Sequence, residues 1–294
     1  MRVTNFMMAY NTKYNLNQNL RRLDQVQTWL STTKRINKPS DDPTGVVNTL
    51  RYTSTIGEAE EYLNKISEAR NFMNTTDSAL ANVTDILHRA NELTIEGING
   101  TSSESAREAI AAELRQLQEQ IGVIANTTYG SKHIFAGTNV TQAPLQNGTW
   151  TANDQTMNLE IGAGTTVPIN STIGELFFNE DAANPGIYQL LGKIATDLEN
   201  GDEAGMNQDL GLIQDKLDGV NQERAIIGAK VNRLDLQENR LESTRINYEE
   251  LLSKNQDADM AEVIMQLKIQ ENVYRASLAA GARIIMPSLV DFLR

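Results

Sequence analysis

The sequence predicts a mainly α-helical protein with an inserted β-rich domain (α+β). We expect a long antiparallel helical bundle, or coiled-coil rod, with terminal helices that are disordered alone or ordered by assembly. Residues 206–252 place apolar side chains at heptad spacing, whereas residues 129–188 are rich in glycine, threonine and asparagine and lack a helical period. Both ends carry amphipathic segments. Interruptions of the helical pattern at residues 36–43 and 253–259 separate these segments from the bundle.

An amphipathic helix is expected from about residue 5 to residue 33. Its apolar stripe is formed by Leu16, Leu20, Leu23 and Leu30. Gln27 is the one polar residue at a stripe position. The helix ends before Pro39, and Asp42 is placed to cap a second helix whose first residue is Pro43. Proline is favoured at that position because the first N–H of a helix has no intrahelical partner.

The second and third helices carry apolar stripes that match the one in residues 206–252. Asn99-Gly100 ends the second helix, and Ser105 with Glu108 forms a capping box for the third. The three stripes together predict a three-helix bundle. The stripe residues are Ile56, Ala59, Leu63, Ile66, Ala69, Met73, Leu80, Val83, Leu87 and Ala90 in the second helix, and Ile110, Leu114, Leu117, Ile121 and Ile124 in the third.

Short runs of alternating polarity predict strands in the inserted segment, near residues 149–151, 157–161 and 165–169. Asn147-Gly148 is a hairpin turn signal. Because helices of the bundle come from both sides of this segment, we expect it to project from the side or the far end of the rod.

The stripe in residues 206–252 is too narrow for a globular core and suits a coiled-coil partner. Arg224, Glu238 and Arg245 interrupt it, which favours a bundle in which some of these positions reach a rim or another subunit. Neither glycine nor proline occurs between Gly228 and Gly281, so nothing local breaks the helix. The stripe consists of Leu210, Ile213, Leu217, Val220, Ile227, Val231, Leu234, Leu241, Tyr248 and Leu252.

A last helix is expected after Asp259, a capping residue with Glu262 at the reciprocal position. Its apolar residues are Val263, Leu267, Tyr274 and Leu278, and the chain ends with the apolar Leu289, Phe292 and Leu293. The predicted domains are an N-terminal assembly helix at 1–40 that pairs with 255–294, two parts of the bundle at 41–128 and 191–254, the β-rich outer domain at 129–190, and a C-terminal assembly helix at 255–294.

The two ends contain too little apolar surface to offset the conformational entropy of ordering them alone. We therefore expect them to fold on assembly, through the residues Leu16, Leu20, Leu23, Leu30, Val263, Leu267, Tyr274, Leu278, Leu289, Phe292 and Leu293. The alternative is that the two ends simply pair within a monomer.

Charge disfavours nucleic acid as the main partner, because 26 basic residues stand against 38 acidic ones, a net of −12. The first forty residues are the exception, with seven basic residues and only Asp24 as an acid. This basic end either contacts an acidic neighbouring subunit or is a solvated helix face. No run is long enough to span a membrane, and the absence of cysteine excludes disulfides.

No pattern of catalytic, metal-binding or cofactor-binding residues is found, which predicts a non-enzymatic protein without cofactors. His88 and His133 are the only histidines, and His88 lies on a helical face where an ordinary surface or bundle residue is expected. Gly162-Ala163-Gly164 lacks the later glycine of a dinucleotide site. Asp257 and Asp259 resemble half of a calcium loop without its glycine and terminal glutamate.

Several blocks of this sequence resemble the bacterial flagellin superfamily. The N-terminal block, residues 34–45, contains Arg35, Ile36, Asn37, Pro39, Ser40, Asp41, Asp42, Pro43 and Gly45. Residues 258–262, 274–278 and 287–293 are similar to the C-terminal block, and residues 133–137 to the segment where such chains leave the bundle. The proline-bearing form of the first block fits the hook–filament junction family, hook-associated protein 3, better than filament flagellin.

The resemblance implies a secreted structural adaptor of the bacterial flagellum that joins hook-associated protein 1 to the flagellin filament and transmits torque. It implies a ring of identical subunits, export through the flagellar type III apparatus, and a possible export chaperone. Three alternatives stay open: filament flagellin itself, an adhesin or protease activity in the β domain, and another type III substrate such as a needle-tip or translocator protein. The terminal blocks disfavour the last of these.

Overall fold

The computed structural model describes residues 5–99, 103–146 and 148–285. Tertiary contacts divide the chain into two compact units, described separately below: unit 1, residues 1–58 and 244–294, and unit 2, residues 59–243. Unit 1 thus includes the first turns of the second helix and the last turns of the sixth. These turns contact each other there, since the rings of Tyr52 and Tyr248 lie 5.8 Å apart.

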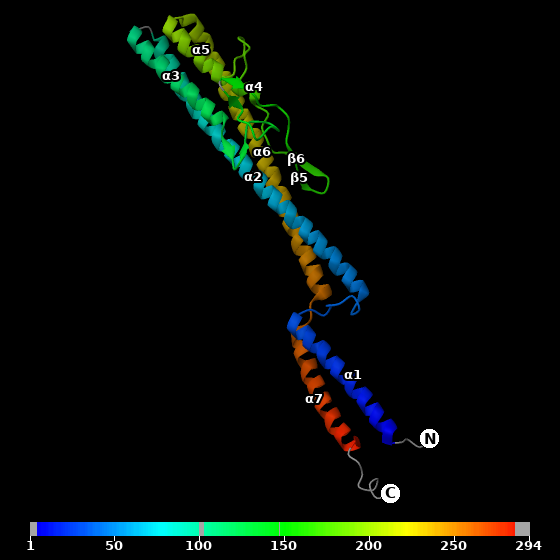
Figure 1. The fold of residues 1–294 in the computed structure, drawn as a ribbon. Coiled ribbons are helices and arrows are strands. Elements are labelled where there is room, and N and C mark those ends of the chain that lie inside the picture. Colours follow the sequence, from blue (N-terminus) through cyan, green and yellow to red (C-terminus); the bar gives the residue numbers. More distant parts are fainter. Residues whose placement is uncertain (1–4, 100–102, 147, 286–294) are drawn as a thin grey trace, which may run out of the picture. The chain divides into compact units, whose positions relative to one another are not determined.

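The described residues form seven helices and six short strands (Figure 1). The helices are α1 (Asn5–Thr32), α2 (Pro43–Ile98), α3 (Glu104–Ala125), α4 (Gly174–Phe177), α5 (Ile187–Asn200), α6 (Glu203–Gln256) and α7 (Met260–Ile285). The strands are β1 (Thr128–Tyr129), β2 (Lys132–His133), β3 (Leu145–Gln146), β4 (Thr149–Trp150), β5 (Asn158–Gly162) and β6 (Thr165–Pro168). The predicted mainly α-helical fold with a small β insertion is confirmed. No described helix is both long enough and apolar enough to cross a membrane.

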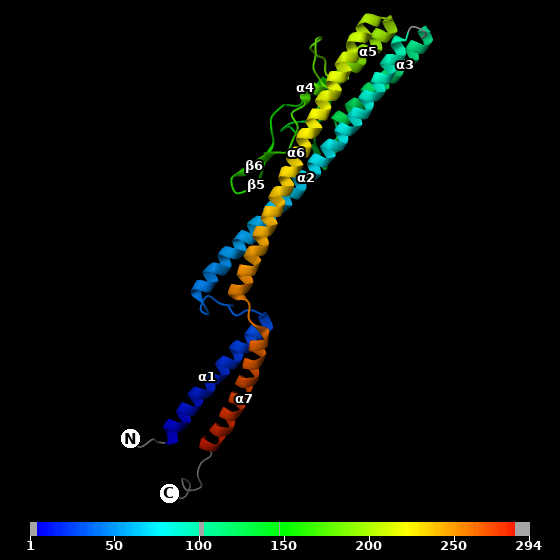
Figure 2. The same cartoon turned by 180° about the vertical axis from the view of Figure 1, so that it is seen from behind.

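Unit 2 has one hydrophobic core, to which α2, α3, α5 and α6 all contribute. The predicted stripes supply most of it, because Ile66, Leu80, Leu114, Ile213 and Leu234 are almost completely buried. The expectation of three helices was wrong. Helix α5 is the fourth, and it lies beside α3 in both views (Figures 1 and 2). Its fourteen residues directly follow the glycine-rich insertion.

Two of the charges that interrupt the α6 stripe are paired with α2 inside unit 2. The Arg224 guanidinium lies 2.9 Å from the Asp77 carboxylate. Glu238 accepts a hydrogen bond from Arg70, which also lies 2.9 Å from Asp235. These charges therefore pair across the bundle, and the alternation of their signs favours the observed register of the two helices.

The β insertion consists of three antiparallel two-stranded hairpins, β1–β2, β3–β4 and β5–β6. The hairpin predicted from Asn147-Gly148 is confirmed by its strands, because Gln146 pairs with Thr149, and Gly148 has a φ of 77°; Asn147 itself lies outside the described residues. Ile161 and Phe177 belong to the same buried cluster as the helices, so the insertion is part of unit 2. It is held by the Gln237 side-chain amide, which donates to the Ile161 carbonyl at 3.2 Å.

Side chains cap the helices as predicted in two of three places. Asp42 accepts from the Gly45 N–H at 2.9 Å at the start of α2, and Asp259 accepts from the Ala261 N–H at 2.9 Å at the start of α7. The expected cap of α3 was wrong, because Ser103 rather than Ser105 accepts from the Ala106 N–H. Ser105 lies within the first turn of the helix instead.

Asp209 is the most deeply buried carboxylate of unit 2, with no exposed surface. Burial raises the pKa of its carboxyl, and the Lys193 ammonium, 2.6 Å from Oδ1, opposes that rise. His88 is exposed on α2. Among the described residues, no three histidine, aspartate or glutamate side chains are grouped so that they could hold a metal ion.

Candidate assembly surface

Helices α1 and α7 of unit 1 lie side by side and antiparallel (Figures 1 and 2). Each turns one heptad-spaced stripe toward the other, as expected for a two-helix coiled coil. The less exposed residues that mark these stripes are Ala9, Thr12, Leu16, Asn19, Leu23, Val26 and Leu30 in α1, and Val263, Leu267, Gln270, Tyr274, Ser277 and Gly281 in α7.

The contact between these helices is partly polar. The Asn19 side-chain amide donates to the Ser277 hydroxyl at 2.8 Å, and a Cβ at Gly281 would lie 3.1 Å from the Thr12 methyl group. Only Val26 and Val263 are buried apolar side chains among the described residues of the two helices. Such a pair buries little apolar surface, so its helices gain only limited stability from each other.

The predicted assembly residues fall into three groups. Val263 is buried, and Leu16, Leu23, Leu30, Leu267 and Tyr274 are half-buried. Leu20 and Leu278 are 46% and 44% exposed, so the contact between the helices buries neither of them. Leu289, Phe292 and Leu293 lie outside the described residues. The predicted stripe of α1 was wrong in phase at Leu20, because Asn19 and Val26 occupy the facing positions between the leucines.

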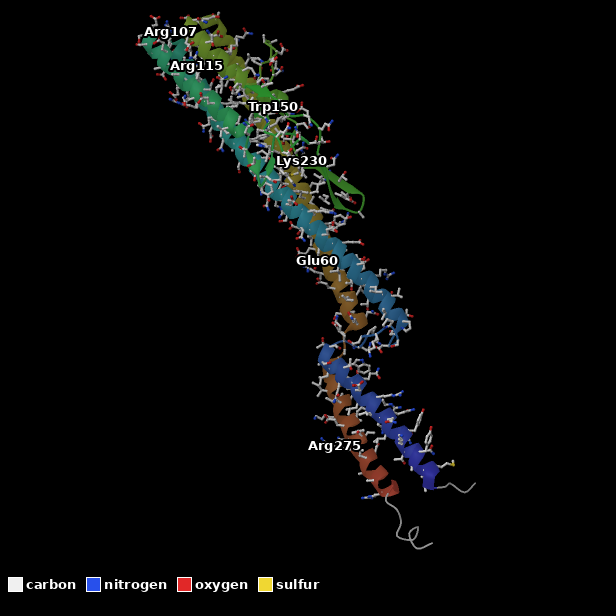
Figure 3. All side chains as sticks on the ribbon, in the orientation of Figure 1. Glu60, Arg107, Arg115, Trp150, Lys230 and Arg275 are labelled. Carbon is white, nitrogen blue, oxygen red and sulfur yellow. The ribbon has the colours of Figure 1, made fainter. Side chains whose placement is uncertain are left out.

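Most exposed apolar side chains of the described chain belong to unit 1. Fourteen of the eighteen large ones lie there, although unit 2 is the longer unit. Tyr10 and Leu278 border a groove of about 600 Å³ between α1 and α7, and side chains extend from both helices into the solvent (Figure 3). The fourteen are Met7, Met8, Tyr10, Tyr14, Leu20, Val47, Leu50, Ile246, Leu251, Ile264, Met265, Ile269, Val273 and Leu278. Exposed apolar surface of this kind marks an interaction site.

The connectors that enter and leave this helix pair are joined to each other by backbone hydrogen bonds. Residue Thr33, with a φ of 59°, ends α1 in a left-handed conformation. The Arg35 N–H donates to the Gln256 carbonyl at 2.8 Å, and the Ala258 N–H donates to the Thr33 carbonyl at 3.0 Å. Lys34 and Asp257 thereby form an isolated antiparallel β-bridge. The two aspartates that resemble half of a calcium loop thus have structural roles: Asp257 is part of this backbone contact, and Asp259 caps α7.

The N-terminal motif supplies the side chains of this junction. Asp41 accepts from the Asn37 and Lys38 N–H groups at 3.1 and 2.9 Å, which closes the turn containing the exposed Pro39 and Ser40. The Arg35 guanidinium donates to the Asn255 carbonyl at 3.0 Å and lies 3.7 Å from Asp42. The contact between Arg35 and Asn255 joins residues that are 220 positions apart in the sequence, whereas the others are local.

Gly45 is required by close packing in the same junction. A Cβ at this position would lie 2.5 Å from the Cδ1 atom of the buried Ile36 and 2.6 Å from Asp42. The Asn255 side-chain amide donates to the Gly45 carbonyl at 2.8 Å and to the Thr49 hydroxyl at 2.9 Å. The motif residues therefore have a structural role: they fix the connector between α1 and α2 against the one between α6 and α7.

We expect amide hydrogens in α1 and α7 of the isolated protein to exchange at least about 100-fold faster than those of α3 and α5. The reason is the small apolar core and the polar layers of the α1–α7 contact. Hydrogen exchange followed by mass spectrometry measures all four helices in one experiment, with α3 and α5 as the internal control. Equal protection would support the alternative, that the ends complete their folding within a monomer.

Two family models match this chain. The bacterial flagellin N-terminal helical region matches residues 3–140, and the bacterial flagellin C-terminal helical region matches residues 210–293. Together they cover about three quarters of the 294 residues. The chain belongs to the bacterial flagellin family. It is therefore a structural protein of the flagellum and assembles with other flagellar components.

Relatives of this flagellin-family chain include both filament and hook-associated proteins. It is 27% identical to a flagellar filament 30.7 kDa core protein of Treponema maltophilum over 88% of each chain. It is also 27% identical to flagellar hook-associated protein 3 of Escherichia coli, over 60% of this chain and 59% of that one. The fold is shared with the flagellar junction protein FlgL of Legionella pneumophila, with a TM-score of 0.58 at 15% identity, covering 73% of this chain and all of that one.

Proposed function

We propose that this flagellin-family chain is the junction subunit between the flagellar hook and the filament. The observation that carries the proposal is the sequence match to hook-associated protein 3. The N-terminal block supports it, because Pro39 and Pro43 both stand in the form expected of junction proteins. The protein acts mechanically, by transmitting torque through packed helices, and no chemistry is required of it.

The proposed partners follow from this position. Hook-associated protein 1 lies on the hook side, flagellin on the filament side, and further copies of the chain complete a ring. The exposed apolar side chains of α1 and α7 supply contact surface for these neighbours. The protein is secreted through the flagellar type III apparatus, with a chaperone covering apolar surface before export, and it resides outside the cell.

One observation favours filament flagellin as a second candidate function: the match to a filament core protein spans 88% of the chain. The two functions differ in self-assembly. A filament subunit elongates purified filament fragments into long polymers, whereas a junction subunit adds at an end and stops. Electron microscopy of seeded filaments measures the difference directly.

A deletion strain tests the proposed function. Cells without this protein are expected to build hooks that carry no filament and to shed flagellin into the medium, and re-expression is expected to restore both filaments and swimming. Immunoblots of culture supernatants and electron microscopy of hooks measure these outcomes. Normal filaments on the mutant cells would contradict the junction role. Loss of flagellin from both cells and medium, with extensive elongation of seeds, would instead identify the chain as flagellin.

A further inference from the structure

The two compact units have opposite net charge. Unit 1 contains 14 basic and 11 acidic residues, a net of +3, whereas unit 2 contains 12 basic and 27 acidic residues, a net of −15. This division matters for assembly because like-charged surfaces repel and opposite ones attract across a Debye length.

The cations of unit 2 are occupied by groups of the same chain. Seven of the twelve form ion pairs with carboxylates: Lys65, Arg70, Arg89, Arg115, Lys132, Lys193 and Arg224. Lys216, Lys230 and Arg233 donate to oxygen atoms of Asn184, Asn170 and Thr166. Unit 2 therefore has an excess of carboxylates, and its described cations are engaged within the chain.

Five cations at the N-terminal end of unit 1 behave differently. We call them the cationic face: Lys13, Arg21, Arg22, Lys34 and Lys38, all exposed. Within the part of the chain that the structure describes, none of their side chains forms an ion pair or a hydrogen bond. The first three lie outside the α1 stripe that faces α7, so the pairing of these helices leaves them accessible. Asp24 is the only acidic residue of α1.

The strongest acidic counterpart is the stretch from the end of α5 through the first part of α6. Residues 197–223 contain eight acidic residues and a single basic one, Lys216. Asp209 is buried against Lys193, but a set of four exposed carboxylates, here called the acidic segment, faces solvent. It consists of Asp202, Glu203, Asp215 and Asp218. A basic face without internal partners and an acidic segment without internal cations are complementary.

We propose that the cationic face of α1 and its connector binds the acidic segment at the start of α6 in a second copy of this chain. The proposal rests on the assembly role proposed above and adds the surfaces that recognise each other between neighbouring copies. The apolar side chains of α1 and α7 supply contact area, while the charges select the neighbour and its orientation. The contact also relieves the repulsion between acidic units that a ring of copies brings together.

Sedimentation velocity on the full chain tests this contact. Self-association is expected to weaken at least tenfold when NaCl is raised from about 50 to about 500 mM, because salt screens exposed charges. The double substitution Lys13→Glu with Arg21→Glu is expected to weaken it at least tenfold at low salt. The matched control Lys254→Glu with Lys268→Glu changes net charge equally in unit 1 but replaces cations already paired with Glu250 and Glu271. The control is expected to associate as the unaltered chain does.

A complementary pair of variants identifies the counterpart. Asp215→Lys with Asp218→Lys is expected to abolish self-association, and mixing this variant with the Lys13→Glu, Arg21→Glu variant is expected to restore association between the two. Failure of the mixture to associate, salt-independent association of the unaltered chain, or no association at all would overturn the proposal. These outcomes are distinct from failure of the junction role, which the deletion strain tests through its filaments.

Discussion

Replacing Ile194 with alanine is expected to lower the free energy of unfolding of unit 2 by about 3 kcal/mol. Ile194 lies in α5, has no exposed surface and belongs to the core that α5 shares with α3. Truncation removes buried methyl and methylene groups and leaves a cavity that close-packed helices fill only partly. An effect of this size is a large fraction of the stability of an ordinary domain.

Urea denaturation followed by tryptophan fluorescence measures this effect in unit 2 alone. The chain has one tryptophan in each unit, Trp29 in α1 and Trp150 in β4. A Trp29→Phe background therefore leaves only the unit 2 signal. Thr196→Ala, at an exposed position of the same helix, is the control and is expected to change stability by less than about 0.5 kcal/mol. Equal effects of the two substitutions would show that α5 does not contribute to the core.

Helix α5 shows where the prediction from sequence was incomplete. Ile187, Leu190, Leu191, Ile194 and Leu198 are all buried and follow a helical period. Gly201, with a φ of 71°, ends the helix as a C-terminal glycine commonly does. These signals were present in the sequence. They were overlooked because the predicted bundle already had three matching stripes and appeared complete without a fourth helix.

The α1 stripe shows a second way in which prediction from the sequence was incomplete: the positions that face α7 were assigned in the wrong phase. Four leucines suggested a stripe through Leu20, yet the facing positions are Asn19 and Val26. Asn19 is satisfied there by Ser277, a residue 258 positions away. A polar residue at a facing position is tolerated when its hydrogen-bond partner is provided, and no local pattern reveals that partner. Apolar content alone therefore predicted the helix but not its orientation.

The connector junction could be predicted only in part. Local rules identified Asp42 and Asp259 as caps and Pro43 as the first helical residue, because each acts on its own helix end. The bridge between Lys34 and Asp257 and the bonds from Asn255 to Gly45 involve backbone atoms of distant segments. Resemblance to a known family marked these motif residues, and the structure supplies the physical reason for them.

Replacing Met265 and Ile269 with aspartate is expected to abolish swimming while leaving unit 2 as stable as before. These side chains are 61% and 57% exposed on α7, one helical turn apart, with Val273 a further turn along. Burial against a neighbouring subunit would contribute about 2 kcal/mol for each, and aspartate would replace that gain with the cost of burying a charge. Because a ring repeats this contact in every copy, the lost binding free energy is multiplied by the number of contacts in the ring.

The matched control lies in unit 2. Leu236 is 72% exposed on α6, more than either α7 residue, so Leu236→Asp removes a comparable apolar side chain from a different surface. Swim-plate diameter and the amount of flagellin shed into the medium measure the outcome, and the urea midpoint of each variant reports folding. If exposure alone made a side chain important, the Leu236 variant would fail as badly as the α7 variant. Failure that is confined to α7, and that Met265→Asp alone also produces, would assign assembly to the terminal helices, because this single substitution and Leu236→Asp both place aspartate at an exposed apolar position but in different units.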